Sequence, residues 1–470
     1  MSPDGASAEA AIARALAGFD DGGFHDALAR RVALPTVAAD AERGHPAIRA
    51  YLDREMRPSL EALGCTVREV ANSEAPGSPL LIGARDEDPG LPTVLCYGHA
   101  DVVPGMEGAW SDGRDPWRLT RVGERWYGRG TADNKGQHSI VLAALAAVLA
   151  TRGRLGFNLR WLIDASEETG SPGLRAICLA ERAAIQADFV LASDGPRLDP
   201  ERPTLVLGTR GAVNFALRLK LREGGLHSGN WGGLARNPAT ILANALAAII
   251  DAQGRCAVAA WAPDSLTDEI RAALSGIEPR GEHVDPTWGA EGLTPAERVF
   301  GWNTFEVLAL GAGDPVAPVN AIPPQAVAQC QIRTVVGTDV PALLPALRRF
   351  LDERGFAEVA IEAAEEPMFR ATRLSPADPL ARLVADEMAA ISGRPTAVLP
   401  NAGGSLPTDV FADDLGMPTL WVPHSYTGCG QHGPDEHLLE PVAREGLAIM
   451  TGLFWRLGQG LPAGVLARRE

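Results

Sequence analysis

Several features that mark common classes of protein are scarce or missing in this 470-residue sequence. The six cysteines are widely scattered and form no Cys-x-x-Cys pair, a usage that favours reduced, buried thiols in a cytoplasmic protein over a disulfide framework. No apolar run reaches the length of a membrane span. Residues 1–31 mix Asp, Glu and Arg with alanine, so they do not resemble a signal peptide.

Basic residues are also fewer than acidic residues. The sequence holds 43 Lys and Arg against 59 Asp and Glu, and no basic run of five or more compensates for the net charge of -16. This balance argues against nucleic acid and against anionic membranes as partners. No Gly-x-Gly-x-x-Gly turn follows the first core strand, which argues against a dinucleotide-binding dehydrogenase. What remains is a globular chain of ordinary composition, long enough for two domains.

The first part of the chain has the pattern of an α/β protein. Buried strands are expected at 93–97, 158–163 and 189–192, and each ends in polar residues. Helices are expected at 8–34, 45–64 and 139–150, and short strands at 65–70 and 80–84. Alternation of strands and helices predicts a mostly parallel sheet with its site at the carboxyl edge.

From residue 205 the pattern changes. Residues 212–221 alternate apolar and polar side chains, as a half-exposed antiparallel strand does. Two strand–helix–strand units follow, which predicts an inserted α+β domain over 208–371 within a discontinuous domain of 1–207 and 372–470. Residues 251–300 are expected to be a long irregular connection. The remaining elements are expected as helices at 238–250, 340–354, 377–391 and 441–456, and strands at 305–309, 327–335, 359–363 and 419–422.

Five histidines and acids follow predicted strands or lie in Gly-rich turns. Imidazole and carboxylate are suitable ligands for divalent metals, and ligands from several strand ends can converge. Each acid taken alone is more often a solvated loop carboxylate, but chance does not readily place all five at such positions. The candidate ligands are His99, Asp133, Glu168, Asp194 and His432.

Three acids have distinct expected roles around these ligands. One carboxylate can bridge two metals, and Asp133 is the candidate. Glu167 adjoins Glu168, and because adjacent residues rarely ligate one ion, Glu167 can stay free as general base. Asp101 lies two residues after His99 and so points to the same face, where it can orient the imidazole.

These motifs resemble those of the dinuclear-metal amidohydrolases, a family that includes carnosine dipeptidases, carboxypeptidase G, acetylornithine deacetylase, succinyl-diaminopimelate desuccinylase and aminoacylase. The resemblance rests on Gly98–Pro104, Gly128–Gly136, Glu167-Glu168, Ser193-Asp194 and His432, in that order along nearly the whole chain. It implies a catalytic domain of zinc-peptidase type, the five ligands above, a bridging Asp133 and a general base at Glu167. The inserted domain would be a lid that also forms a homodimer.

The inserted domain carries further matches, closest to the carnosine dipeptidase branch. His227 in Leu226–Gly233 resembles the family histidine that stabilises the oxyanion, in many relatives from the partner subunit. Arg333 matches the residue that clamps the substrate carboxylate, a task suited to the guanidinium fork. Asn320 corresponds to a residue that bonds nearby, and Ser405 to a turn that approaches the substrate. Read from the residues alone, His227 and Ser405 are turn residues and Arg333 is a strand-surface charge.

The sequence therefore predicts a hydrolase of amide bonds that uses two divalent metals, with zinc expected and manganese or cobalt as alternatives. A dipeptidase or carboxypeptidase acting on a substrate with a free carboxylate is the first interpretation. An N-acyl-amino-acid deacylase with the same machinery is the second. A metal-free binding protein that keeps the fold would require lost ligands, and all five are present.

Overall fold

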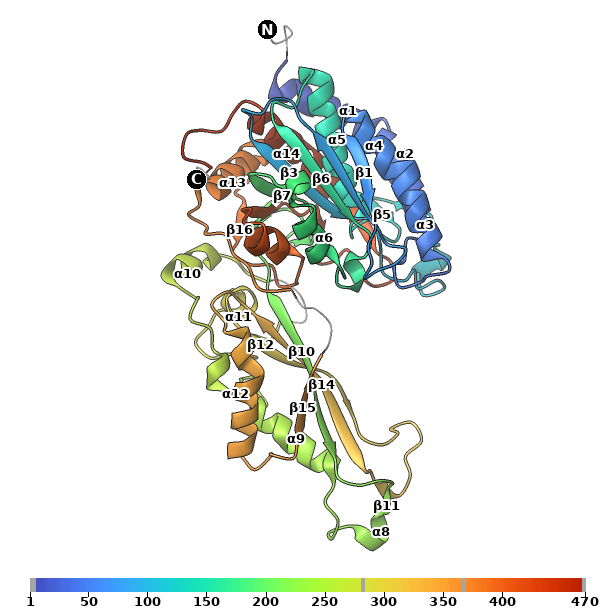
Figure 1. Ribbon diagram of the computed structural model, residues 1–470, viewed down its shortest axis with the longest axis vertical. Coiled ribbons are helices and arrows are strands. Elements are labelled where there is room, and N and C mark those ends of the chain that lie inside the picture. The colour runs from blue at the N-terminus through green and yellow to red at the C-terminus, as the bar shows by residue number, and fades with distance from the viewer. Residues whose placement is uncertain (1–5, 280–283, 365–368, 467–470) are drawn as a thin grey trace. The chain divides into compact units, whose positions relative to one another are not determined.

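Strands β3 (Thr93–His99) and β6 (Asn158–Asp164) lie side by side and parallel at the centre of the main sheet. Alternate side chains of β3 point to opposite faces, and both faces are buried. The computed structural model describes residues 6–279, 284–364 and 369–466 (Figure 1). These residues divide into two compact units, one of 6–208, 374–402 and 407–466 and the other of 209–279, 284–364, 369–373 and 403–406.

The first unit contains an eight-stranded sheet in the order β1-β2-β6-β3-β7-β17-β9-β16. Four of its seven neighbouring pairs are parallel, and the antiparallel pairs are β1 with β2, β2 with β6, and β17 with β9. The other strands of the sheet are β1 (Thr66–Val70), β2 (Leu80–Arg85), β7 (Phe189–Ala192), β9 (Thr204–Val206), β16 (Ala397–Leu399) and β17 (Thr419–Trp421).

Helices pack on this sheet in a thick layer that holds the main apolar core. Its members are α1 (Ala8–Asp20), α2 (Gly23–Val32), α5 (Lys135–Arg152), α13 (Pro379–Ser392) and α14 (Glu440–Leu457). Short helices α6 (Leu174–Ala180) and α7 (Arg182–Ile185) follow β6, and α3 (Gly44–Tyr51) and α4 (Arg57–Ala62) precede β1. Smaller pairings join β4 (Thr120–Val122), β5 (Arg125–Tyr127) and β19 (His437–Leu439), and β8 (Pro196–Arg197) with β18 (Ser425–Tyr426).

The second unit is an antiparallel sheet in the order β12-β14-β10-β15. Its strands are β10 (Gly211–Lys220), β12 (Thr304–Gly311), β14 (Gln325–Thr334) and β15 (Ala360–Ala363), with β11 (Leu226–His227) and β13 (Ala321–Ile322) forming a separate pair. Its helices are α8 (Ser228–Trp231), α9 (Pro238–Ile249), α10 (Asp268–Leu274), α11 (Pro295–Phe300) and α12 (Val340–Glu353). Apolar side chains of β10, β12 and β14 pack with α9 and α12 in a second core.

The expected fold class is confirmed, with several local corrections. The helix expected over 8–34 is two helices, because Gly22 takes a left-handed φ of 93° between them. The helix expected from residue 139 begins at Lys135. The connection expected to be irregular over 251–300 contains α10 and α11. Finally, β18 and β19 follow the strand that was expected to be the last.

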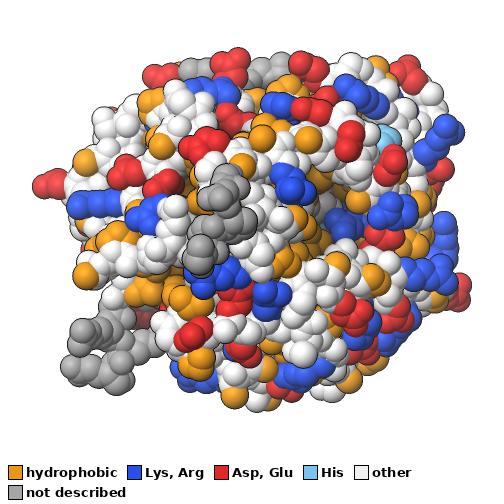
Figure 2. Space-filling model, turned by 90° about the horizontal axis from the view of Figure 1, so that it is seen from above, with side chains coloured by type: hydrophobic (Ala, Val, Ile, Leu, Met, Phe, Trp, Pro, Cys, Tyr) orange, Lys and Arg blue, Asp and Glu red, His pale blue; other side chains and the backbone are white. Residues whose placement is uncertain are grey.

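None of the helices in the described ranges combines the length and the apolarity that a membrane span needs. Acidic and basic side chains are interspersed over the face drawn in Figure 2.

Candidate active site

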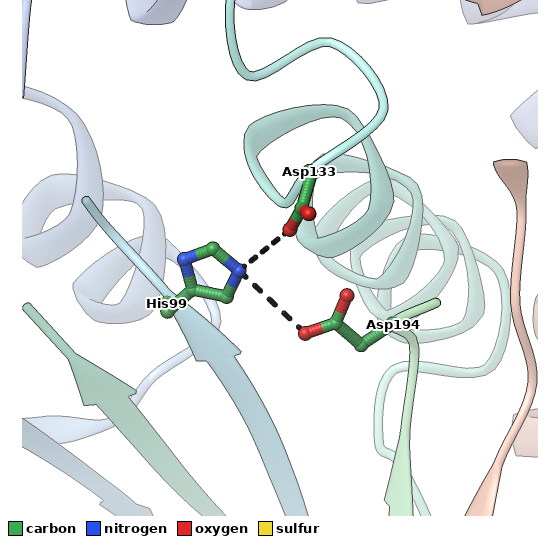
Figure 3. A group of neighbouring side chains, drawn as sticks. All are labelled: His99, Asp133 and Asp194. Carbon is green, nitrogen blue, oxygen red and sulfur yellow. Dashed lines mark hydrogen bonds and ion pairs between the residues drawn. The ribbon is translucent and has the colours of Figure 1, made fainter. Parts of the chain in front are cut away.

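The polar residues at the carboxyl ends of the central strands meet in one place. His99 ends β3, Asp194 follows β7, and Asp133 lies in the turn before α5 (Figure 3). His99 Nε2 is 2.9 Å from Asp133 Oδ1 and 3.6 Å from Asp194 Oδ2. The imidazole is fully buried, and the two carboxylates are almost so. The parallel strands β3 and β7 bring His99 and Asp194 together because their carboxyl ends share an edge of the sheet.

A second group shares the same aspartate. His432 Nε2 lies 3.1 Å from Asp133 Oδ2 and 3.1 Å from Glu168 Oε2. The two oxygens of Asp133 therefore face two different imidazoles. Each group places one ligand atom per residue within 4.8 Å of the others, a spacing at which a metal ion could be held.

The charged groups in this cluster shift one another's pKa values. Hydrogen bonding to Asp133 and Glu168 raises the pKa of His432 to about 10. Burial, and then the charge of Asp133, raises the pKa of Asp194 to about 7. Burial raises the pKa of Glu167 well above its ordinary range, and nearby Asp194 and Glu168 raise it further. So many buried carboxylates in one place are costly unless cations compensate them.

The donor set fits divalent metal ions. Glu168 Oε1 and Asp194 Oδ2 are buried, and no hydrogen-bond donor in the described ranges reaches either oxygen. Buried polar atoms are rarely left without a partner, and a metal ion is one partner that would satisfy them. Carboxylate and imidazole together suit zinc, manganese and cobalt.

Asp101 has more contacts than its spacing from His99 indicated. Its Oδ1 accepts the backbone N–H of Glu167 at 3.0 Å, and its Oδ2 accepts that of Glu168 at 3.1 Å. His99 Nδ1 lies 3.0 Å from the backbone carbonyl of Asp101 and 3.5 Å from its carboxylate. The Asp101 carboxylate thus holds the turn that carries the candidate base, while its carbonyl orients the imidazole.

Sequence reasoning missed a polar chain beneath the cluster. Asn134 Nδ2 donates to the carbonyl of Ser193 at 2.8 Å, and Asn134 Oδ1 lies 3.0 Å from His138 Nδ1. His138 Nε2 in turn is 2.5 Å from the hydroxyl of Tyr51. Asn134 and His138 lie four residues apart at the start of α5, but nothing in the sequence indicated that they would be buried.

Another missed pair is Arg129 and Glu436, which are fully buried and 2.7 Å apart. Glu436 is four residues from His432, and Arg129 is four residues from Asp133. The only sequence signal was their position inside motifs already chosen for other residues.

The remaining predicted residues all belong to the second unit. Arg333 Nη1 donates to Ser405 Oγ at 2.9 Å, and Ser405 Oγ donates to the carbonyl of Arg210 at 2.6 Å. At the other end of β14, the carbonyl of Asn320 accepts the backbone N–H of Ser228 at 2.9 Å, next to the exposed His227.

Arg333 and Asn320 are therefore not brought together. Arg333 pairs with Ala212 at one end of β10, and Gln325 pairs with Lys220 at the other. Eight residues of extended strand between Gln325 and Arg333 correspond to roughly 26 Å. The structure therefore does not place Asn320 near Arg333 within one chain, and the role of Asn320 stays a prediction.

Comparison with known proteins shows which family the chain resembles. The profile of "Peptidase family M20/M25/M40" matches residues 95–456. A Beta-Ala-His dipeptidase of Mus musculus is 31% identical over 206 residues, which cover 43% of this chain and 41% of that protein. A cysteinylglycine-S-conjugate dipeptidase of Corynebacterium striatum is 31% identical over 264 residues, or 53% of this chain and 56% of that protein. The chain thus spans about half the length of these curated relatives.

The fold has solved counterparts. An M20 family metallo-carboxypeptidase from Sulfolobus solfataricus superposes with a TM-score of 0.79 at 23% sequence identity, over 93% of this chain and 99% of that one.

Proposed function

Because the chain belongs to peptidase family M20/M25/M40, we propose that it is a dinuclear metal-dependent hydrolase of amide bonds, a dipeptidase or carboxypeptidase acting on small substrates with a free carboxylate. The observation that carries the proposal is the pair of ligand groups that share Asp133. Relatives named as dipeptidases favour this activity over the deacylase alternative.

Two metal ions would be held by the five candidate residues, one by each group, with Asp133 between them. His99 and Asp194 complete one group, and Glu168 and His432 complete the other. Divalent ions there would act as Lewis acids on the scissile carbonyl and make water acidic enough to serve as a nucleophile near neutral pH. We expect zinc, with manganese or cobalt as alternatives, since the ligand types suit all three.

Glu167 would move the proton. Burial raises the pKa of its carboxyl group, which makes the carboxylate a stronger base than an exposed one. It would take a proton from the attacking water and pass it to the amide nitrogen as the C–N bond breaks. The hydrogen bonds from the backbone N–H groups of Glu167 and Glu168 to the Asp101 carboxylate would hold Glu167 in place for both proton transfers.

Arg333 would bind the free carboxylate of the substrate. Its guanidinium is half-buried, and its one described hydrogen bond, to Ser405 Oγ, leaves further N–H groups free to donate. Ser405 is itself fixed by the carbonyl of Arg210. A guanidinium held in this way is suited to bidentate recognition of a carboxylate.

His227 would stabilise the oxyanion, and Asn320 would assist it, in the site of a partner subunit. A dipeptide cannot span the roughly 26 Å of strand that separates this end of β14 from Arg333. A homodimer would resolve the difficulty, because each copy would supply the residues that the other lacks. Strand β12 is at an edge of its sheet and exposes Val307, Leu308 and Leu310, which is consistent with a subunit interface.

A cytoplasmic location is part of the proposal. All six cysteines are free thiols, and five of them are buried. Reduced thiols are typical of cytoplasmic proteins.

The decisive experiment is hydrolysis of a mixed substrate panel by metal-stripped protein resupplied with zinc, manganese or cobalt. The panel contains dipeptides, N-acetyl amino acids and N-succinyl amino acids, and Glu167→Ala is the control. We expect dipeptide cleavage that needs metal and is lost in the variant. Turnover of N-acyl amino acids alone would establish the deacylase alternative, and no turnover by protein that holds two metals would refute the substrate class.

A further inference from the structure

Glu436 has no assigned role in the reaction, yet its carboxylate connects the segments that carry two of the candidate metal ligands, Asp133 and His432. Its Oε1 accepts the backbone N–H groups of Ala132 at 2.9 Å and Asp133 at 3.1 Å. Its Oε2 accepts the N–H of Gly130 at 3.1 Å and Arg129 Nη1 at 2.7 Å. Both oxygens are fully used and the side chain is 1% exposed, so Glu436 has no lone pair to offer a metal.

Arg129 extends the connection to two more segments. Its Nη2 donates to the carbonyl of Gly433 at 2.9 Å, next to His432, and its Nε donates to the carbonyl of Pro104 at 3.2 Å, shortly after His99 and Asp101. The guanidinium is completely buried. One ion pair thus ties together the chain after β3, the turn of Asp133 and the segment of His432.

We propose that Glu436, with Arg129, is a positioning residue that holds the bridging Asp133 and the ligand His432 in register before metal binds. The inference rests on the proposed dinuclear centre and explains what positions two of its ligands. The turn of residues 130–133 presents several backbone N–H groups that no regular strand or helix uses. A single acceptor that satisfies three of them fixes the position of the turn.

The chain contains a matched control. The Glu87 side chain is 9% exposed, against 1% for Glu436, and its carboxylate accepts the backbone N–H groups of Leu155 at 2.7 Å and Gly156 at 2.8 Å and pairs with Arg85 at 2.9 Å. The backbone groups that Glu87 binds precede β6. They lie at the end of this strand opposite to Asp164 and the site. A substitution of Glu87 therefore removes the same kind of bonds without touching a ligand-bearing segment.

The test compares Glu436→Gln with Glu87→Gln. In Glu436→Gln an amide NH₂ replaces one carboxylate oxygen and faces N–H donors, so the two hydrogen bonds of that oxygen are lost while the shape of the side chain is kept. Zn²⁺ affinity is measured by calorimetric titration of the metal-free protein, and thermal unfolding of the same samples reports stability. We expect Glu436→Gln to weaken Zn²⁺ binding about 10- to 100-fold, the range for losing a group that supports a metal ligand. We expect Glu87→Gln to lose comparable stability and no affinity.

Equal Zn²⁺ affinity in wild type and Glu436→Gln would overturn the inference, as would equal loss in both variants. If the proposed metal centre itself is wrong, the wild-type protein will bind no Zn²⁺ at all, which distinguishes this outcome from the two above.

A measurement on unsubstituted protein covers the case in which Glu436→Gln does not fold. Hydrogen–deuterium exchange of residues 130–133 is followed in the metal-free and Zn²⁺-loaded wild type. Slow exchange in both forms, matching residues 155–156, is expected if Glu436 preorganises the turn. Fast exchange that becomes slow only with Zn²⁺ would mean that the metal orders the turn, and would refute the role.

Discussion

Replacing Asp101 with asparagine removes one negative charge and tests how the candidate base is held. The Asp101 side chain is completely buried, and its two oxygens accept the backbone N–H groups of Glu167 and Glu168 at 3.0 and 3.1 Å. Asparagine keeps one oxygen and places an NH₂ group where the other was. Whichever way the amide turns, one backbone N–H then faces a second donor at hydrogen-bonding distance.

The size of the effect follows from that geometry. A hydrogen bond to a charged group contributes about 1.5–3 kcal/mol, and one such bond is lost in Asp101→Asn. If the lost bond leaves Glu167 less well placed in the transition state, the activation free energy rises by this amount. Each 1.36 kcal/mol of that rise lowers the rate tenfold. We therefore expect kcat to fall about 10- to 150-fold. The backbone carbonyl of Asp101, which orients His99, is unchanged by the substitution.

Steady-state hydrolysis of a dipeptide, with metal content measured on the same samples, checks this prediction. Asp188→Asn is the matched control, because Asp188 Oδ2 accepts the backbone N–H of Thr93 at 2.7 Å at the start of β3, away from the site. A kcat for Asp101→Asn within twofold of the control, at equal metal content, would refute the reasoning.

Three further predictions concern metal, substrate and pH. A chelator should abolish activity, and restored Zn²⁺ should raise the unfolding temperature, since ligand at 100 times its Kd contributes about 2.7 kcal/mol per site; an unchanged temperature would contradict the metal centre. Arg333→Met should raise KM about 10- to 100-fold for dipeptides but not for their C-terminal amides, because only the former present a carboxylate; equal effects would exclude carboxylate binding. Burial lowers the pKa of Lys135 from 10.5 to about 7, so between these values the unfolded chain binds a proton that the folded chain does not. The free energy of unfolding should therefore rise with pH across that window by about 1.4 kcal/mol per unit relative to Lys135→Met, as denaturant titrations at several pH values would measure.

The candidate ligands at strand ends could be predicted from the sequence because two local rules are sufficient to place them. A buried apolar run predicts a parallel strand, and the polar residue after it must lie at the carboxyl edge of the sheet. His99 at the end of β3 and Asp194 shortly after β7 follow directly. Their common neighbour Asp133 required only a Gly-rich turn before an apolar helix. The assignment of roles to these residues stays a prediction.

Residues whose partners lie far along the chain could not be predicted in the same way. Lys135, Gln137 and His138 look like loop residues, so the helix was expected to begin only after them. They are buried because Lys135 Nζ donates to the carbonyls of Arg31 and Leu34, and Gln137 Oε1 accepts the backbone N–H of His424. Such contacts join residues that are far apart in the sequence, so the local periodicity of apolar residues does not predict them.

The same distinction explains why the Arg129–Glu436 pair matters for the site. The sheet can align His99 and Asp194, since adjacent strands fix their ends. It cannot align Asp133 and His432, which lie in irregular segments separated by 299 positions. Something outside the sheet must bring those two segments to the sheet edge, and in the described chain a buried carboxylate and guanidinium contact both. The proposed positioning role of this ion pair would therefore explain why the two oxygens of Asp133 face both imidazoles.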